Sequence, residues 1–174
     1  MTHADDRADR PSLPTRRATL GSIGTLVGTL LAGCLGAGAG PTYGADDPDR
    51  VPVDVEGDDR TPEEVTAAAS LAEQQPAESV SAVDGLVAPD HEFVLEDGYL
   101  GSTVQGTVEN RRGGRVALVE VRVRVYDDAG DLLGTYMART ADLEGNHAWS
   151  FTVVILESPN DIGAYDIGVQ GAPG

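Results

Sequence analysis

Cys34 is the only cysteine in the sequence and carries its most reactive side chain. A thiolate can act as a nucleophile or a metal ligand, but a single cysteine cannot form an intramolecular disulfide bond. The residues before Cys34 indicate another role. Arg16 and Arg17 precede residues 18–31, which contain no charged side chain. This run of about 14 residues is shorter than the roughly 20 that a helix needs to cross a bilayer.

The order of these features is typical of a secretory signal: a charged start, a short apolar run and a site of small residues. Arg16 and Arg17 resemble a twin-arginine signal, which implies export of a folded protein. Leu31, Ala32, Gly33 and Cys34 resemble a lipobox, the motif of prokaryotic lipoproteins. The resemblance implies removal of the signal peptide, residues 1–33, and attachment of lipid to Cys34, which leaves no free thiol. The alternative is an uncleaved N-terminal anchor with an incidental cysteine.

Few other residues are of types and spacings that support catalysis or metal binding. A blue-copper site needs two histidines, a cysteine thiolate and an axial ligand such as methionine. With Cys34 at the membrane end, only His91, His147 and Met137 are available for such a site. No acidic pair and no Ser/His/Asp set lies in a recognisable motif. The sequence therefore predicts no catalytic residue and no cofactor.

One acidic turn is a candidate cation site. Asp127, Asp128 and Asp131 lie close together in the sequence. Calcium requires six to eight oxygen ligands, and this turn lacks the bidentate glutamate of an EF-hand loop. Aspartate also favours turns, which explains these residues without a cation. We predict no metal ligand here and leave cation binding open.

The charge composition is strongly acidic. The 174 residues include 29 Asp and Glu and 12 basic residues, all Arg, which gives a net charge of −17. The acids are dispersed along the chain, which favours a surface adapted to very high salt, where screening acts within about 3 Å. Nucleic-acid binding is disfavoured because phosphate contacts require clustered basic residues.

Residues 34–89 are predicted to be a lipidated N-terminus followed by a flexible acidic tether, because glycine, alanine, proline and aspartate dominate much of this segment. A short helix is expected over residues 62–75. Thr61 and Glu64 form a capping-box pattern around Pro62, and Pro76 ends the helical sequence. The apolar face of this helix is thin, so whether it docks on a domain or frays stays open.

From residue 91 onward, apolar and polar residues alternate as in strands with one buried face. Valines at positions 119, 121, 123 and 125 alternate with four residues on a face expected to be solvated: Glu120, Arg122, Arg124 and Tyr126. Strands are expected at residues 92–97, 102–110, 115–128, 131–140, 147–156 and 164–170, with turns at 127–130 and 142–146. This pattern predicts an all-β fold, a small antiparallel β-sandwich over residues 90–174.

The sequence of residues 92–170 resembles the FxLYD domain, as found in secreted lipoproteins of halophilic archaeal type. The matching positions are Gly106, Val108, Asn110, Tyr126, Asp127, Gly130, Asp142, Leu143, Gly145, Trp149 and Phe151. The resemblance implies an immunoglobulin-like sandwich and an extracytoplasmic location; it implies no activity. The stretch 156–163 is looser than the family pattern.

These features predict a protein held at the cell membrane by lipid on Cys34 and facing the extracellular side. The expected role is a non-catalytic interaction or accessory module of the cell envelope, with an envelope protein of unknown identity as partner. The alternative is a small-ligand or ion-binding accessory subunit of a transporter or envelope enzyme.

Overall fold

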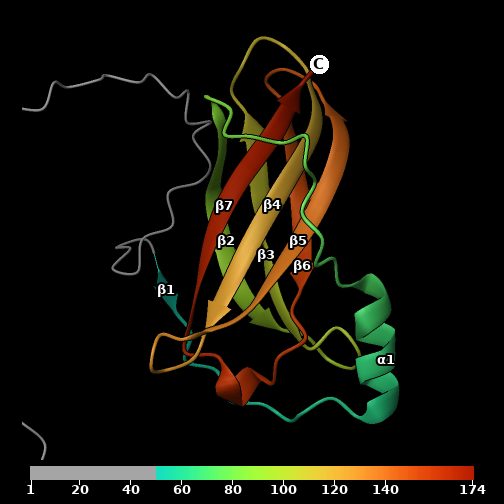
Figure 1. Ribbon diagram of the computed structural model, residues 1–174, viewed down its shortest axis with the longest axis vertical. Helices are drawn as coiled ribbons and strands as arrows, with labels where there is room; N and C mark the ends of the chain where they lie inside the picture. Colours follow the sequence, from blue (N-terminus) through green and yellow to red (C-terminus); the bar gives the residue numbers. More distant parts are fainter. Residues whose placement is uncertain (1–49) are drawn as a thin grey trace, which may run out of the picture. The chain divides into compact units, whose positions relative to one another are not determined.

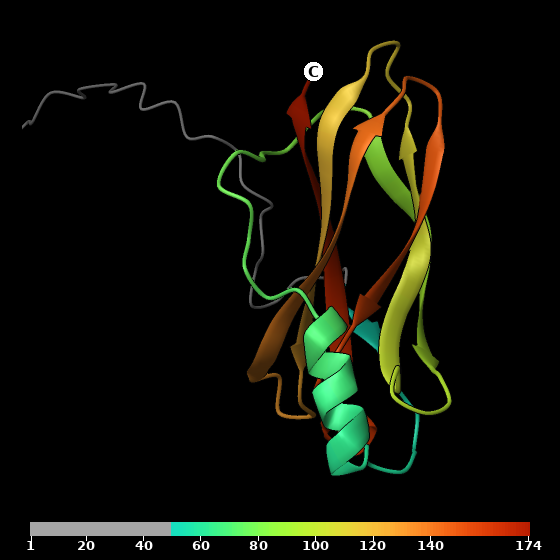
Figure 2. The ribbon, with the colours of Figure 1, turned by 90° about the vertical axis from the view of Figure 1, so that its right-hand side faces the viewer.

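The computed structural model describes residues 50–174, which form a two-layer antiparallel β-sandwich with one α-helix beside it (Figures 1 and 2). One sheet has the strand order β1-β7-β4-β5, and the other has the order β2-β3-β6. The strands are β1 (Val51–Pro52), β2 (Leu86–Leu95), β3 (Ser102–Asn110), β4 (Val116–Tyr126), β5 (Leu132–Leu143), β6 (Ala148–Val154) and β7 (Ala164–Pro173). The predicted all-β sandwich is thereby confirmed.

The alternating valines of β4 lie at the centre of the hydrophobic core. Val119, Val121, Val123 and Val125 are fully buried between the sheets. From the facing sheet, Val104, Val108, Phe151 and Val153 belong to the same cluster, and Trp149 packs against it. β-branched side chains suit this arrangement because they pack well on a pleated surface. Strands β3 to β7 thus form where the period-two pattern predicts them.

Helix α1 (Pro62–Leu71) begins at the predicted capping box. The backbone N–H of Thr61 donates to Glu64 Oε2 at 2.9 Å, and the backbone N–H of Glu64 donates to Thr61 Oγ1 at 3.4 Å. The helix ends at Leu71 rather than at residue 75. The helix ends because Ala72 adopts an extended backbone, with φ of −68° and ψ of 125°, after which the carbonyl of Glu73 accepts a hydrogen bond from the backbone N–H of Met137 on β5, at 2.8 Å. Ala68 is fully buried, so α1 is docked.

The described part of the predicted tether, residues 50–89, belongs to the folded domain. β1 pairs with β7. The Arg60 guanidinium donates to the carbonyls of Tyr99, Leu100, Ser102 and Ile155, which joins the segment before α1 to the β2–β3 connection and to the residue that follows β6. The predicted boundary between residues 89 and 90 falls inside β2. The domain assignment is corrected accordingly; residues 34–49 lie outside the described part of the chain.

Residues 72–83, which we call the strap, cross the outer face of the sheet that contains β4. The strap pairs with one edge of this sheet through Glu73 and Met137 on β5. It then crosses β4, where the backbone N–H of Ala77 donates to Glu120 Oε2 at 2.8 Å. Finally, Ser81 and Gly171 on β7 exchange two backbone hydrogen bonds of 3.0 and 2.8 Å. The strap is therefore attached at three points, mainly by polar contacts.

The strap explains why the face of β4 predicted to be solvated is partly covered. Glu120 is 0% exposed and Tyr126 is 3% exposed, although both alternate with the buried valines. Arg122 and Arg124 retain about a fifth of their side-chain exposure, at 20% and 19%. The expectation of a solvated face is thus wrong for Glu120 and Tyr126, because the strap covers Glu120 and the Arg50 guanidinium lies over the Tyr126 ring, 3.6 Å from its centroid.

Candidate functional site

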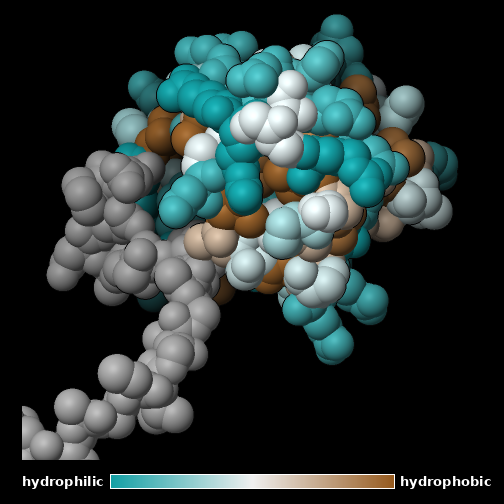
Figure 3. Space-filling model, turned by 90° about the horizontal axis from the view of Figure 1, so that it is seen from above, coloured by the Kyte–Doolittle hydropathy of each residue, from teal (hydrophilic) through white to brown (hydrophobic). Residues whose placement is uncertain are grey.

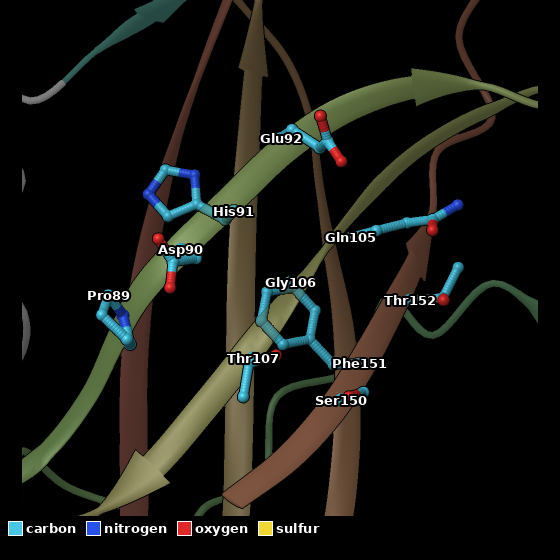
Figure 4. A pocket seen from close by; sticks show the side chains of 10 residues that line it. All are labelled: Pro89, Asp90, His91, Glu92, Gln105, Gly106, Thr107, Ser150, Phe151 and Thr152. Atoms are coloured by element: carbon cyan, nitrogen blue, oxygen red, sulfur yellow. The ribbon is translucent and has the colours of Figure 1, made fainter.

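The outer face of the other sheet carries an open polar trough of 690 Å³ (Figure 4). The register of β2, β3 and β6 forms two rows across the strands, one on each side of the trough. The first row is Glu92, Gln105 and Thr152, and the second is Asp90, Thr107 and Ser150. Between them lies a row of His91, Gly106 and Phe151. The side chains of His91 and Phe151 point into the sandwich and Gly106 has none, so backbone forms the floor of the trough.

Gly106 is required at the centre of this floor. A Cβ atom added there would lie 2.8 Å from Phe151 Cζ and 2.9 Å from His91 Cβ, and closer still to the carbonyl oxygen of Asp90. Real Cβ atoms do not approach neighbours so closely. The absence of a side chain at position 106 therefore allows the neighbouring β2 backbone and the Phe151 ring to approach β3 closely.

Strand β2 forms an edge of this sheet, and its irregularity protects that edge. The register shifts between Val87 and Asp90, and Pro89 lies within the shifted segment. Proline has no backbone N–H, and a bulge disrupts the ladder, so both oppose pairing with another strand. The trough is consequently more suitable for contacts through side chains than for addition of a strand along β2.

His91 and Tyr165 form a buried polar contact beneath the trough. His91 Nδ1 and the Tyr165 hydroxyl are 2.9 Å apart, and their rings meet edge to face. Burial lowers the pKa of His91, although Asp90 opposes the change. Burial, followed by the charge of Glu92, raises the pKa of Tyr165 to about 12. Both side chains are therefore neutral at neutral pH, which suits a structural contact between the sheets.

The trough offers hydroxyl, amide and carboxylate groups to solvent. Glu92, Ser150 and Thr152 are exposed, and Gln105 is held in place by hydrogen bonds from its Nε2 to Glu96 Oε1 (2.7 Å) and Thr103 Oγ1 (3.1 Å). An activated serine needs a base within hydrogen-bond reach. Within the described residues, no histidine is hydrogen-bonded to Ser150, since His91 points into the sandwich. The arrangement is thus suited to binding polar groups.

The residues considered for copper binding are held by separate contacts. His91 contacts Tyr165, His147 Nδ1 is 3.0 Å from the carbonyl oxygen of Gly145, and Met137 Sδ accepts from Arg139. Across residues 50–174, no group of three or more His, Cys, Asp or Glu side chains is placed to hold a metal ion.

The acidic turn has a structural explanation. Asp127 Oδ1 accepts a hydrogen bond from the backbone N–H of Asp131 at 2.8 Å, and the carbonyl of Asp127 accepts from Gly130 at 3.0 Å. Gly130 has a φ of +86°, a conformation that glycine adopts readily. Asp127 therefore closes the β4–β5 hairpin.

A charge network that the sequence did not reveal lies on the opposite sheet. Glu120 pairs with Arg122 and with Arg139. Nearby, Asp166 pairs with Arg124 at 2.6 Å and accepts a hydrogen bond from the Tyr126 hydroxyl at 2.8 Å. Burial and then this hydrogen bond raise the pKa of Tyr126 to about 12. Only the cross-strand register and the strap bring these groups together, so no motif could indicate them.

The remaining predicted site residues lie outside residues 50–174: Arg16, Arg17, Leu31, Ala32, Gly33 and Cys34. Within the described range, no helix is both long and apolar enough to cross a bilayer. Comparison with known proteins found no matching family model, curated protein or solved structure.

Proposed function

We propose that this chain is an exported, lipid-anchored envelope protein whose sandwich is a non-catalytic interaction or accessory module. The export and anchoring part rests on Arg16–Arg17, the short apolar run and the sequence Leu31-Ala32-Gly33-Cys34. Its similarity to secreted FxLYD-domain lipoproteins is part of the same proposal. The dispersed acidity supports work in high salt, where surface charges are screened.

One structural observation supports the proposed interaction role. The polar trough is open, whereas the charged face of the other sheet is largely covered. Glu120 and Asp166 are buried and paired with arginines that hold the fold together. The trough residues Ser150 and Thr152 are exposed and available to a partner. An open surface of hydrogen-bonding groups suits contact with the polar surface of another envelope protein.

Docking of residues 50–89 sets how far the module can reach from the membrane. The chain between Cys34 and Arg50 comprises residues 35–49. A fully extended segment of that length spans at most about 50 Å. A tether that continued to residue 89 would reach several times further. The proposal therefore places the sandwich close to the bilayer, with partners that are themselves near the membrane.

Capture of the native lipoprotein from membranes in molar salt tests the interaction role. We expect one stoichiometric partner with the wild type and its loss with Thr152→Lys, which places a long cation in the trough. Ala69→Lys, on the exposed side of α1, is the matched control and should retain the partner. Equal recovery from all three proteins would contradict a role for the trough, and absence of any partner would contradict the interaction role.

A further inference from the structure

The exposed arginines of the domain are gathered in one loop. Residues 50–174 contain eight arginines, and three of them, Arg111, Arg112 and Arg115, lie between β3 and β4 in residues 111–115, which we call the arginine loop. The C-terminal Gly174 donates its backbone N–H to Arg115, whereas β1 pairs with the beginning of β7. The arginine loop thus lies at the end of the sandwich away from β1 (Figure 1).

The buried side chain of Asn110 holds this loop in place. Asn110 Nδ2 donates to the carbonyls of Gly114 (2.9 Å), Leu143 (3.0 Å) and Glu144 (3.1 Å). Its Oδ1 accepts from the backbone N–H of Arg112 at 3.1 Å. With 1% exposure, Asn110 is a rigid link between the arginine loop and the β5–β6 turn.

The β5–β6 turn packs directly against the arginine loop. The backbone N–H of Asn146 donates to the carbonyl of Arg112 at 3.1 Å. A side chain at Gly145 would lie 2.7 Å from the same carbonyl oxygen, so glycine permits the approach. A backbone held in this way loses little further conformational entropy on binding.

The arginine side chains themselves remain accessible. Arg111 pairs with Glu109 at 2.8 Å, with side-chain exposures of 59% and 39%. Arg115 pairs with Asp142, at 47% and 61% exposure. Exposed pairs of this kind contribute only about 0–1 kcal/mol, so an incoming carboxylate can replace the internal one. Arg112 is exposed and has no ion-pair partner within the described residues.

A hollow of 290 Å³ adjoins the loop and is lined by Glu109, Asn110, Arg111, Asn146, His147 and Ala148. Arg111 lines its wall together with Glu109, to which its Nε donates at 2.8 Å. Viewed from this end, the molecule shows mostly hydrophilic side chains (Figure 3). The hollow therefore offers space for a small side chain beside the exposed guanidinium groups.

We propose that the arginine loop and this hollow form a docking site for a carboxylate-rich segment of another protein. Residues 50–174 contain 23 Asp and Glu against eight Arg, so most of the domain repels such a segment. Guanidinium groups bind carboxylates in a planar, two-point geometry. The glutamate and aspartate now paired with Arg111 and Arg115 occupy the positions that carboxylates of the partner would take. This inference does not depend on lipidation of Cys34.

Binding of a fluorescein-labelled decaglutamate peptide to the full chain tests the proposal. We expect saturable binding at the lowest salt concentration at which the chain stays folded, with amide shift changes confined to residues 109–115 and 142–148. Arg112→Gln should weaken the affinity by about threefold to tenfold. The triple variant Arg111→Gln, Arg112→Gln, Arg115→Gln should abolish binding. Glu144→Gln should strengthen binding because it removes a neighbouring negative charge.

Ala69→Glu on α1 is the control, because it makes the same change in net charge as Arg112→Gln at a distant, exposed position. Equal weakening by both variants would show a net-charge effect and overturn the proposal. Stronger binding of inorganic phosphate or dextran sulfate than of the peptide would overturn the carboxylate assignment. If the chain self-associates with increasing concentration and Arg112→Gln abolishes this, the occupant is a second copy of the chain. That result would also overturn the proposal.

Discussion

The buried carboxylate of Glu120 on β4 accepts a hydrogen bond from Arg139 Nε on β5 at 2.7 Å, and each residue of this cross-strand pair also binds the strap. Arg139 also pairs with Glu73 at the start of the strap, at 2.7 Å. Burial alone would raise the pKa of Glu120, but donation from Ala77, Arg139 and Arg122 outweighs it and lowers the pKa. Glu120 is thus ionised and fully paired in the folded protein.

Replacing Glu120 should therefore destabilise the fold and release the strap. Glu120→Ala leaves two partly buried arginines without their shared carboxylate, and we expect a loss of about 2–4 kcal/mol in the free energy of unfolding. Chemical denaturation measures the loss, and limited proteolysis should show faster cleavage within residues 72–83. Glu73→Gln, at an exposed pair, should cost less than about 1 kcal/mol. Equal losses for the two variants would refute the central role of Glu120.

Two glycines, one within β3 and one in the loop that follows it, should respond differently to the same change. Gly106→Ala should lower stability by about 1–3 kcal/mol, because the added methyl group meets β2 and Phe151. Gly113→Ala should be tolerated, since no atom lies within 4 Å of its added Cβ. Thermal unfolding of both variants checks the prediction. A Gly106→Ala protein as stable as the wild type would show that Phe151 and the β2 backbone do not approach Gly106 as closely as described.

Asn110 should be essential for the shape of the arginine loop. Asn110→Asp replaces a donor that faces three carbonyl oxygens with a carboxylate oxygen, so we expect a loss of about 2–4 kcal/mol. The control is Asn160→Asp, because Asn160 Nδ2 donates to a single exposed carbonyl, that of Gly57, at 2.8 Å. Denaturation of both variants should show a much smaller loss for the control.

His91 should make stability depend on pH. Its folded-state pKa is lowered by burial, so the unfolded chain binds a proton first as pH falls. The free energy of unfolding should therefore decrease as pH falls below about 6.5 and level off once the folded state is also protonated. Urea denaturation between about pH 7 and pH 5 measures this. His91→Gln should remove this decrease, whereas His147→Gln should retain it.

The strands were predictable because their residues alternate with a period of two over a buried face. Val119 to Val125 are the clearest case, and β3 has the predicted bounds of residues 102–110. The strap was not predictable, because it has little apolar pattern. Its attachment depends on Glu120 and Arg139, which are brought together only when β4 and β5 pair.

The polar trough and the arginine loop likewise could not be predicted in full from the sequence. Thr107, Ser150 and Asp90 lie far apart in the sequence and meet only through the register of three strands. The sequence RRGGR at residues 111–115 is the densest group of arginines in this acidic chain, so the position of the arginine loop is evident from composition alone. Its rigid support by Asn110 required the structure.

Metabolic labelling of the exported protein with a radioactive lipid precursor tests the central claim most directly. The wild-type chain should appear as a labelled band in the membrane fraction. Cys34→Ser should lack the label and leave the membrane fraction, because the only thiol is lost. A Cys34→Ser protein that stays in the membrane to the same extent as the wild type, or a wild-type protein without label, would contradict lipid anchoring.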